Sequence, residues 1–168
     1  PDLTAWEHRK EEKKENGMKT LTVALIGAGN RGEIYTDIMK QLPEKYRVVA
    51  VADPNDNHRR NIQCKHALPD EHVFETWEQL LAQPKLADLA VIATQDSMHY
   101  APAMKALAAG YDVLLEKPLA RTEEECIELR EQARKYGRKF MVCHVLRYTP
   151  FYRRLKAVLD EGAIGEVV

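Results

Sequence analysis

The sequence predicts an α/β fold, a doubly wound and mostly parallel β-sheet with helices on both faces. Two observations indicate this class. Short apolar runs alternate with helical segments of about 10–15 residues, which is the pattern of right-handed βαβ units. The runs are also apolar at nearly every position, as strands buried on both faces require.

Six apolar runs are expected to form strands. Leu21–Ile26 and Arg47–Ala52 are the clearest, because almost all of their residues are apolar. The expected strands cover residues 21–26, 47–52, 72–74, 87–93, 113–116 and 139–145.

The segments between and after these strands are expected to form helices. Ile34, Ile38 and Leu42 recur every four residues, which predicts an apolar stripe on the first helix. The expected helices cover residues 33–42, 56–67, 77–83, 97–109, 123–136 and 149–162.

Hydroxyl side chains mark several helix starts. Thr76, Ser97 and Thr122 are expected N-caps, and Thr122-Glu-Glu-Glu125 reads as a capping box. Thr149-Pro150 begins the last helix, because proline suits a first helical turn.

Composition excludes several classes of protein. Apolar residues make up 45% of 168, and this length suffices for one full-sized domain with a core. A net charge of −1 gives no basis for binding nucleic acid or an anionic membrane, and no apolar stretch approaches a membrane span. Cys64, Cys126 and Cys143 form no CxxC pair and fit no zinc spacing, so we expect no metal and a cytoplasmic location.

A glycine-rich turn follows the first expected strand. In Gly27-Ala-Gly29-Asn30-Arg31-Gly32 the first glycine allows a tight turn, the second lets backbone approach a pyrophosphate, and the third lets helix pack close to strand. The helix that follows offers N–H groups to the phosphates. The strand before and the helix after this motif predict a Rossmann-type dinucleotide site.

Asp53 closes the second expected strand, twenty-one residues after Gly32. A carboxylate at this point accepts from both ribose hydroxyls and repels a 2′-phosphate, which favours NAD over NADP. Arg59 and Arg60 would soften that preference if they reached the ribose, and Asp53 could instead cap the loop before Pro54. S-adenosylmethionine sites share both features, so methyl transfer is an alternative at this stage.

Four motifs together resemble the glucose–fructose oxidoreductase / inositol dehydrogenase / MocA family. They are GAGNRG at 27–32, Ala93-Thr94-Gln95 with His99, Glu116-Lys117-Pro118, and Arg147-Tyr-Thr-Pro-Phe-Tyr152, in the family's order over residues 18–168. The Glu116-Lys117-Pro118 turn has no role in methyl transfer, which argues against that alternative.

The resemblance implies roles for these residues. Thr94 and Gln95 would line the path of the cofactor, and His99 would order their loop or contact the cofactor. Glu116 and Lys117 would reach the nicotinamide ribose and the substrate edge, and Lys117 would be catalytic by orienting or polarising the substrate oxygen.

Two residues near the end of the sixth expected strand each have two interpretations. Arg147 resembles a family arginine near the cofactor, although a structural ion pair is an equal alternative. His144 could serve as an acid–base group, but its position within the expected strand indicates a structural role.

The charges in residues 1–17 indicate an extension that is either solvated or packed on a partner subunit. The resemblance implies that a cofactor domain at 18–148 and a linker helix at 149–168 follow it.

The resemblance also implies an activity. A second α+β domain, absent here, would carry the acid–base histidine, the pocket for a polyol or sugar-like substrate and the homo-oligomer interface. We expect an NAD-dependent dehydrogenase when that domain is present and an inactive fragment without it. A non-catalytic dinucleotide sensor is the alternative.

Overall fold

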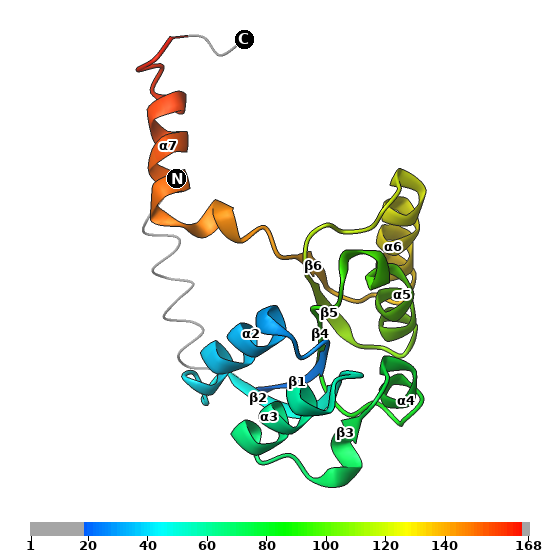
Figure 1. Cartoon of the computed structure of the whole chain (residues 1–168). Coiled ribbons are helices and arrows are strands. Elements are labelled where there is room, and N and C mark those ends of the chain that lie inside the picture. The colour runs from blue at the N-terminus through cyan, green and yellow to red at the C-terminus, as the bar shows by residue number, and fades with distance from the viewer. Residues whose placement is uncertain (1–18, 166–168) are drawn as a thin grey trace.

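A computed structural model describes residues 19–165 and shows a single six-stranded sheet (Figure 1). All five strand pairings are parallel, and the spatial order is β3-β2-β1-β4-β5-β6. This order is that of the doubly wound Rossmann fold, so the predicted fold class is confirmed. The strands are β1 (Leu21–Ile26), β2 (Tyr46–Ala52), β3 (Val73–Phe74), β4 (Leu89–Ile92), β5 (Asp112–Leu115) and β6 (Phe140–Val142).

Helices cover both faces of the sheet, as the strand composition predicts (Figure 1). Alternate residues of one strand point to opposite faces, so Val23 and Leu25 of β1 belong to one core cluster, while Ala24 and Ile26 belong to the other. The helices are α2 (Asn30–Lys40), α3 (Asp56–His66), α4 (Trp77–Leu81), α5 (Tyr100–Ala108), α6 (Glu123–Lys135) and α7 (Pro150–Asp160). The 3₁₀ turns are η1 (Asp70–His72), η2 (Asp96–Met98) and η3 (Val145–Tyr148).

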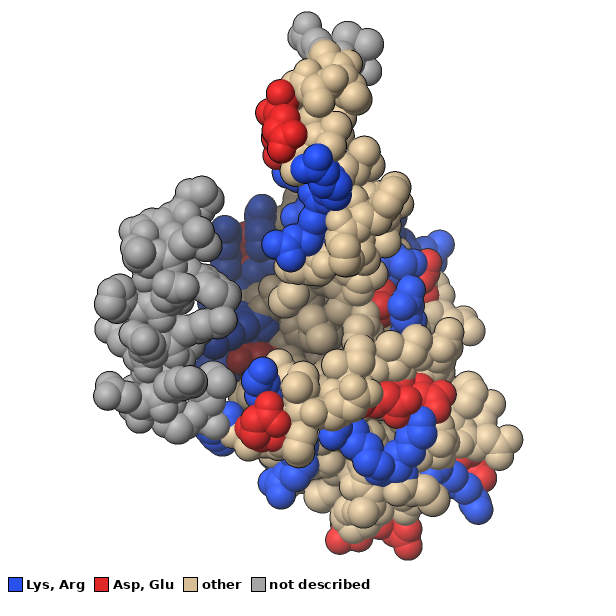
Figure 2. All heavy atoms as spheres, turned by 90° about the vertical axis from the view of Figure 1, so that its left-hand side faces the viewer, with Lys and Arg blue, Asp and Glu red and all other residues tan. Residues whose placement is uncertain are grey.

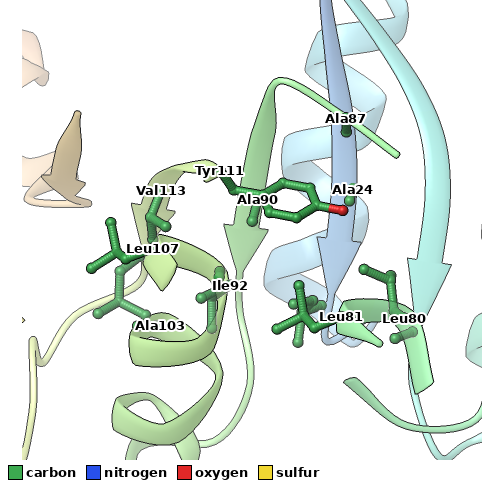
Figure 3. Packing of buried hydrophobic residues seen from close by; sticks show 14 of the residues in the cluster. Ala24, Leu80, Leu81, Ala87, Ala90, Ile92, Ala103, Leu107, Tyr111 and Val113 are labelled. Carbon is green, nitrogen blue, oxygen red and sulfur yellow. The ribbon is translucent and has the colours of Figure 1, made fainter. Parts of the chain in front are cut away.

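The larger core cluster lies between the sheet and α4, α5 and α6. Its bulkiest member is Tyr111, which is fully buried and whose hydroxyl accepts from the Leu86 amide at 2.9 Å. Figure 3 shows the Tyr111 ring lying across the sheet near Ala24 and Ala90. Small residues on β1 and β4 therefore leave the space that this ring fills.

The smaller core cluster lies beneath α2 and α3, and it corrects the predicted stripe on α2. Gly32, Thr36 and Met39 face the sheet, whereas Ile34 is 39% exposed and Ile38 is 50% exposed. The cause is the close approach of α2 to the strand, since a Cβ added at Gly32 would lie 2.1 Å from the Gly27 carbonyl oxygen. Small residues, Gly32 and Thr36, therefore take the inward face of the helix near the glycine turn, and the larger Met39 follows further along.

The predicted N-caps at Thr76 and Thr122 are confirmed, since each hydroxyl accepts from the backbone three residues on. The predicted N-cap at Ser97 is wrong, because Ser97 lies within η2 and His99 is the N-cap of α5. Pro102 explains the later start. It has no N–H to donate to a carbonyl four residues back, so it fits only within the first turn of the helix.

The chain after β5 differs from expectation at two places. β6 ends at Val142, so the expected strand 139–145 is too long, and the exposed His144 follows the strand instead of lying within it. Helix α7 projects away from the sheet (Figure 1), and no residue in it is buried.

The surface of the described part carries both signs of charge. On the face shown in Figure 2, basic and acidic side chains are interspersed. No helix among residues 19–165 is long and apolar enough to cross a bilayer. The predicted charged extension at residues 1–17 lies outside the described residues.

Candidate dinucleotide-binding cleft

A cleft of about 690 Å³ opens at the carboxyl ends of β1, β2 and β4. The chain leaves β1 toward one neighbour and β4 toward the other, and open α/β sheets bind ligands at such a switch point. The lining residues are Ile26, Gly27, Gly29, Asn30, Arg31, Ala52, Asp53, Pro54, Asn55, His58, Glu75, Thr76, Trp77, Glu78, Ala93, Thr94, Gln95 and Met98.

The three glycines of the turn have different surroundings. Gly27 has a φ of +90°, and a Cβ there would lie 2.7 Å from the Ala93 backbone. Gly32 is blocked by the Gly27 carbonyl oxygen. Gly29 meets nothing within 4 Å, because its Cα faces the cleft. Two glycines therefore build the turn, and the third leaves space in the cleft.

Helix α2 begins at the wall of this cleft. Its N-cap is Gly29, which has no side chain to satisfy the free amides of the first turn. These N–H groups and the helix dipole favour an anion at this point. Asn30 and Arg31, both predicted site residues, also line the cleft here.

Asp53 joins the end of β2 to the glycine turn. Asp53 is 8% exposed, and its carboxylate accepts from the Ala28 amide at 2.6 Å and the Asn55 amide at 2.8 Å. His58 Nδ1 lies 3.6 Å from the same carboxylate. The structure thus brings Asp53 beside the glycine turn and also gives it the loop-holding contacts of the alternative interpretation.

The two arginines after Asp53 are engaged outside the cleft. Arg59 is buried and donates to the Asp53 carbonyl at 2.7 Å and to Asp56 at 3.0 Å. Arg60 pairs with Asp56 at 2.7 Å. Neither arginine lines the cleft.

A further wall of the cleft was not predicted. It comprises Asn55 and His58 at the start of α3, and residues 75–78 after β3. Trp77 is the largest of these side chains. The available signal was the position of residues 75–78 after a strand next to β2, because all parallel strands end at the same sheet edge.

The loop after β4 holds the predicted Thr94, Gln95 and His99. Thr94 and Gln95 line the cleft, and the Thr94 hydroxyl donates to the Met98 carbonyl at 3.1 Å. His99 is fully buried beneath them, with Nδ1 2.6 Å from the Pro118 carbonyl oxygen and Nε2 3.2 Å from that of Thr94. Of its two expected roles, this geometry favours ordering of the loop.

The Glu116-Lys117-Pro118 turn follows β5 at the same edge, and its Lys117-Pro118 peptide bond is cis. Lys117 is exposed, whereas Glu116 is only 5% exposed. Glu116 accepts from the Lys117 amide at 2.8 Å and from the hydroxyl of Tyr35, a residue that belongs to none of the sequence motifs. Burial of the phenol, together with the nearby Cys143 and Glu116, raises the pKa of Tyr35, so Tyr35 is the donor.

Arg147 is not brought to the cleft. It lies in η3 and lines a separate hollow of about 750 Å³ with residues of α7, among them Tyr152 and Lys156. Its predicted contact with a cofactor therefore stays a prediction. Across the described residues, His, Cys, Asp and Glu side chains form no group of three that could hold a metal ion.

Comparison with known proteins identifies the family to which this chain belongs. Residues 21–144 match the family described as "Oxidoreductase family, NAD-binding Rossmann fold". The chain is 33% identical over 151 residues to inositol 2-dehydrogenase of Gluconacetobacter diazotrophicus, covering 89% of this chain and 44% of that one. It is 30% identical over 153 residues to 2,7-anhydro-N-acetylneuraminate hydratase of Mediterraneibacter gnavus, covering 90% and 38%.

A solved structure shows the same fold. The WlbA dehydrogenase of Bordetella pertussis, in complex with NADH and UDP-GlcNAcA, has a TM-score of 0.77 at 22% identity, covering 86% of this chain and 44% of that one. The present chain thus spans less than half the length of these relatives. The predicted resemblance is confirmed, and the chain belongs to the glucose–fructose oxidoreductase / inositol dehydrogenase / MocA family of oxidoreductases with an NAD-binding Rossmann fold.

Proposed function

We propose that this chain is the cofactor domain of an NAD(H)-dependent oxidoreductase that prefers NAD over NADP. The observation that carries the preference is Asp53, whose carboxylate lies in the cleft beside the glycine turn. A carboxylate there can accept from the two ribose hydroxyls and disfavours a 2′-phosphate by repulsion. Arg59 and Arg60, which could reverse the preference, are paired outside the cleft.

The rest of the cleft supports the same ligand. The open space at Gly29 and the free amides of α2 suit a pyrophosphate. Asn55, His58 and residues 75–78 lie beyond Asp53, and this wall would hold the adenosine end.

For the whole protein we propose hydride transfer between nicotinamide and a secondary alcohol or ketone of a sugar or cyclitol. The bound nicotinamide supplies the hydride chemistry. Lys117, exposed at the end of β5, would orient or polarise the substrate oxygen. The proton would be exchanged by a histidine of the second domain that the family resemblance implies. Relatives named for inositol and for an anhydro-N-acetylneuraminate support this substrate class. The homo-oligomer and the cytoplasmic location stay predictions.

Calorimetric titration with NADH and NADPH tests the proposal. We expect the chain to bind NADH at least tenfold more tightly than NADPH. Asp53→Asn should reduce this ratio at least fivefold, because the amide no longer repels the 2′-phosphate and cannot accept as well from both hydroxyls. Asparagine also keeps one acceptor oxygen for the backbone amide of Ala28 or Asn55, both of which donate to Asp53 in the free chain.

Glu71→Gln is the matched control, since it removes the same charge from an exposed site outside the cleft. It should leave the ratio unchanged. Equal or tighter binding of NADPH by the unmodified chain would overturn the NAD preference. Failure to bind either dinucleotide would overturn the role of this cleft.

A further inference from the structure

The Lys117-Pro118 turn is held by two buried side chains from different elements. His99, the N-cap of α5, contacts the Pro118 carbonyl at 2.6 Å. On the other side, Glu116 accepts from the Lys117 amide, and Tyr35 of α2 donates to the same carboxylate. Tyr35 is 81 residues from Glu116 in sequence, so this contact joins the helix of the glycine turn to the turn that presents Lys117.

The Glu116 carboxylate has few other partners. Its side chain is 7% exposed, so little water reaches it, and a buried carboxylate needs donors. The Lys117 amide satisfies Oε2, and Tyr35 satisfies Oε1. Arg31 Nε lies 3.8 Å from Oε1, but the Arg31 side chain is 52% exposed to solvent, so this ion pair contributes little to fixing the Glu116 side chain.

We propose that Tyr35 is a positioning residue that fixes Glu116, and through it the backbone of Lys117, relative to the glycine turn. The inference rests on the proposed function for its purpose, because Lys117 is the residue that would face the substrate. Tyr35 does not line the cleft, so it acts on the turn and not on the dinucleotide. Catalytic positions must be held to fractions of an ångström, and such contacts commonly provide that precision.

Amide hydrogen exchange measured by NMR on this chain tests the proposal. The Lys117 amide donates to Glu116, so its exchange rate reports how firmly Glu116 fixes the backbone of the turn. Tyr35→Phe removes only the hydroxyl and should speed Lys117 exchange at least tenfold. The Ala28 amide, which donates to Asp53, is the internal control and should keep its rate.

A double-mutant cycle with Glu116→Gln separates positioning from packing. Glutamine has one acceptor oxygen, whereas the Lys117 amide and the Tyr35 hydroxyl each need one. This variant should therefore also speed exchange of the Lys117 amide. If Tyr35 acts through Glu116, adding Tyr35→Phe to Glu116→Gln should change Lys117 exchange less than twofold. Independent effects that multiply, or an unchanged Lys117 rate in Tyr35→Phe, would overturn the proposal.

Dinucleotide binding distinguishes this proposal from the proposed function. Tyr35→Phe should bind NADH within threefold of the unmodified chain, because Tyr35 lies outside the cleft. A chain that binds no dinucleotide would overturn the proposed function while the exchange results still decide the role of Tyr35. If Tyr35→Phe alone lost NADH binding while the exchange rate of the Ala28 amide stayed unchanged, Tyr35 would be a cofactor contact. That result would overturn the proposal that Tyr35 acts only by positioning Lys117.

Discussion

Gly29 differs from the other two glycines of its turn in what a side chain would meet. Its backbone, with φ −67° and ψ −169°, is one that any residue adopts, and a Cβ would enter open space in the cleft. Gly29→Ala should therefore fold with a loss of at most about 1 kcal/mol. It should weaken NADH binding at least tenfold, because the Cβ would occupy the space into which a pyrophosphate must come.

Gly27→Ala is the contrasting variant. It combines a positive φ with a contact of 2.7 Å to the Ala93 backbone, so it should cost about 1–3 kcal/mol or more in the free energy of unfolding. Urea unfolding and NADH titration of both variants check the contrast. Unchanged NADH affinity in a folded Gly29→Ala chain would show that the ligand does not approach this position.

At the scale of single residues, the sequence predicted the cleft-lining residues that belong to a local motif. Gly27, Gly29 and Asp53 were found because strand, turn and helix follow one another at fixed spacing. Tyr35 was missed because its partner is Glu116, far along the chain, and only the folded sheet brings the two together. No periodicity within α2 distinguishes Tyr35 from a packing residue.

At the scale of elements, the strands and most of the caps could be predicted, but the inward face of α2 could not. Apolar spacing selected Ile34 and Ile38, whereas the structure buries Gly32 and Thr36. The distance between a helix and its sheet decides which face is covered, and that distance depends on the tertiary packing of the glycine turn. The same argument applies to α5, whose start is set by Pro102 and the buried His99 and not by Ser97.

The pairing of β1 with β4 contains an acid-sensitive contact. Asp88 accepts from Lys19 at 2.8 Å, from the Thr22 amide at 3.0 Å and from the Thr22 hydroxyl at 2.9 Å. The Lys19 ammonium, and then the two Thr22 donors, lower the pKa of Asp88 well below its ordinary value. A carboxyl with a depressed pKa in the folded state stabilises the fold above its unfolded pKa, and this contribution is lost as pH falls through the folded value.

Asp88→Asn should therefore cost about 1–3 kcal/mol at pH 7, because the Thr22 amide loses a charged acceptor. The difference from the unmodified chain should shrink as pH falls below about 4, where aspartate in an unfolded chain is protonated. Urea unfolding from pH 7 to pH 2 measures it. Asp96→Asn, at an exposed position, should show no such trend. A stability difference that stays constant down to pH 2 would contradict the assignment.

At the scale of the whole molecule, residues 19–165 form a sheet with helices packed on both faces and one helix, α7, that stands apart from them (Figure 1). Helix α7 packs beside η3 and has no buried residue. Tyr148 and Phe151 are 65% and 70% exposed, and Leu146 and Leu155 are also exposed. Apolar side chains gathered on one projecting segment are typical of a surface that another domain or subunit covers. The predicted boundary between residues 148 and 149 falls at the start of this helix.

A chain that ends at Tyr148 tests that boundary. Because no residue of α7 is buried, its removal should change the melting temperature of the sheet domain by less than about 3 °C, which corresponds to about 1 kcal/mol for a domain of this size. It should also reduce binding of an apolar dye such as ANS, since Phe151 and Leu155 are removed. NADH affinity should stay within twofold, because no residue of α7 lines the cleft. A fall of 10 °C or more would show that α7 belongs to the cofactor domain and would move the boundary beyond it.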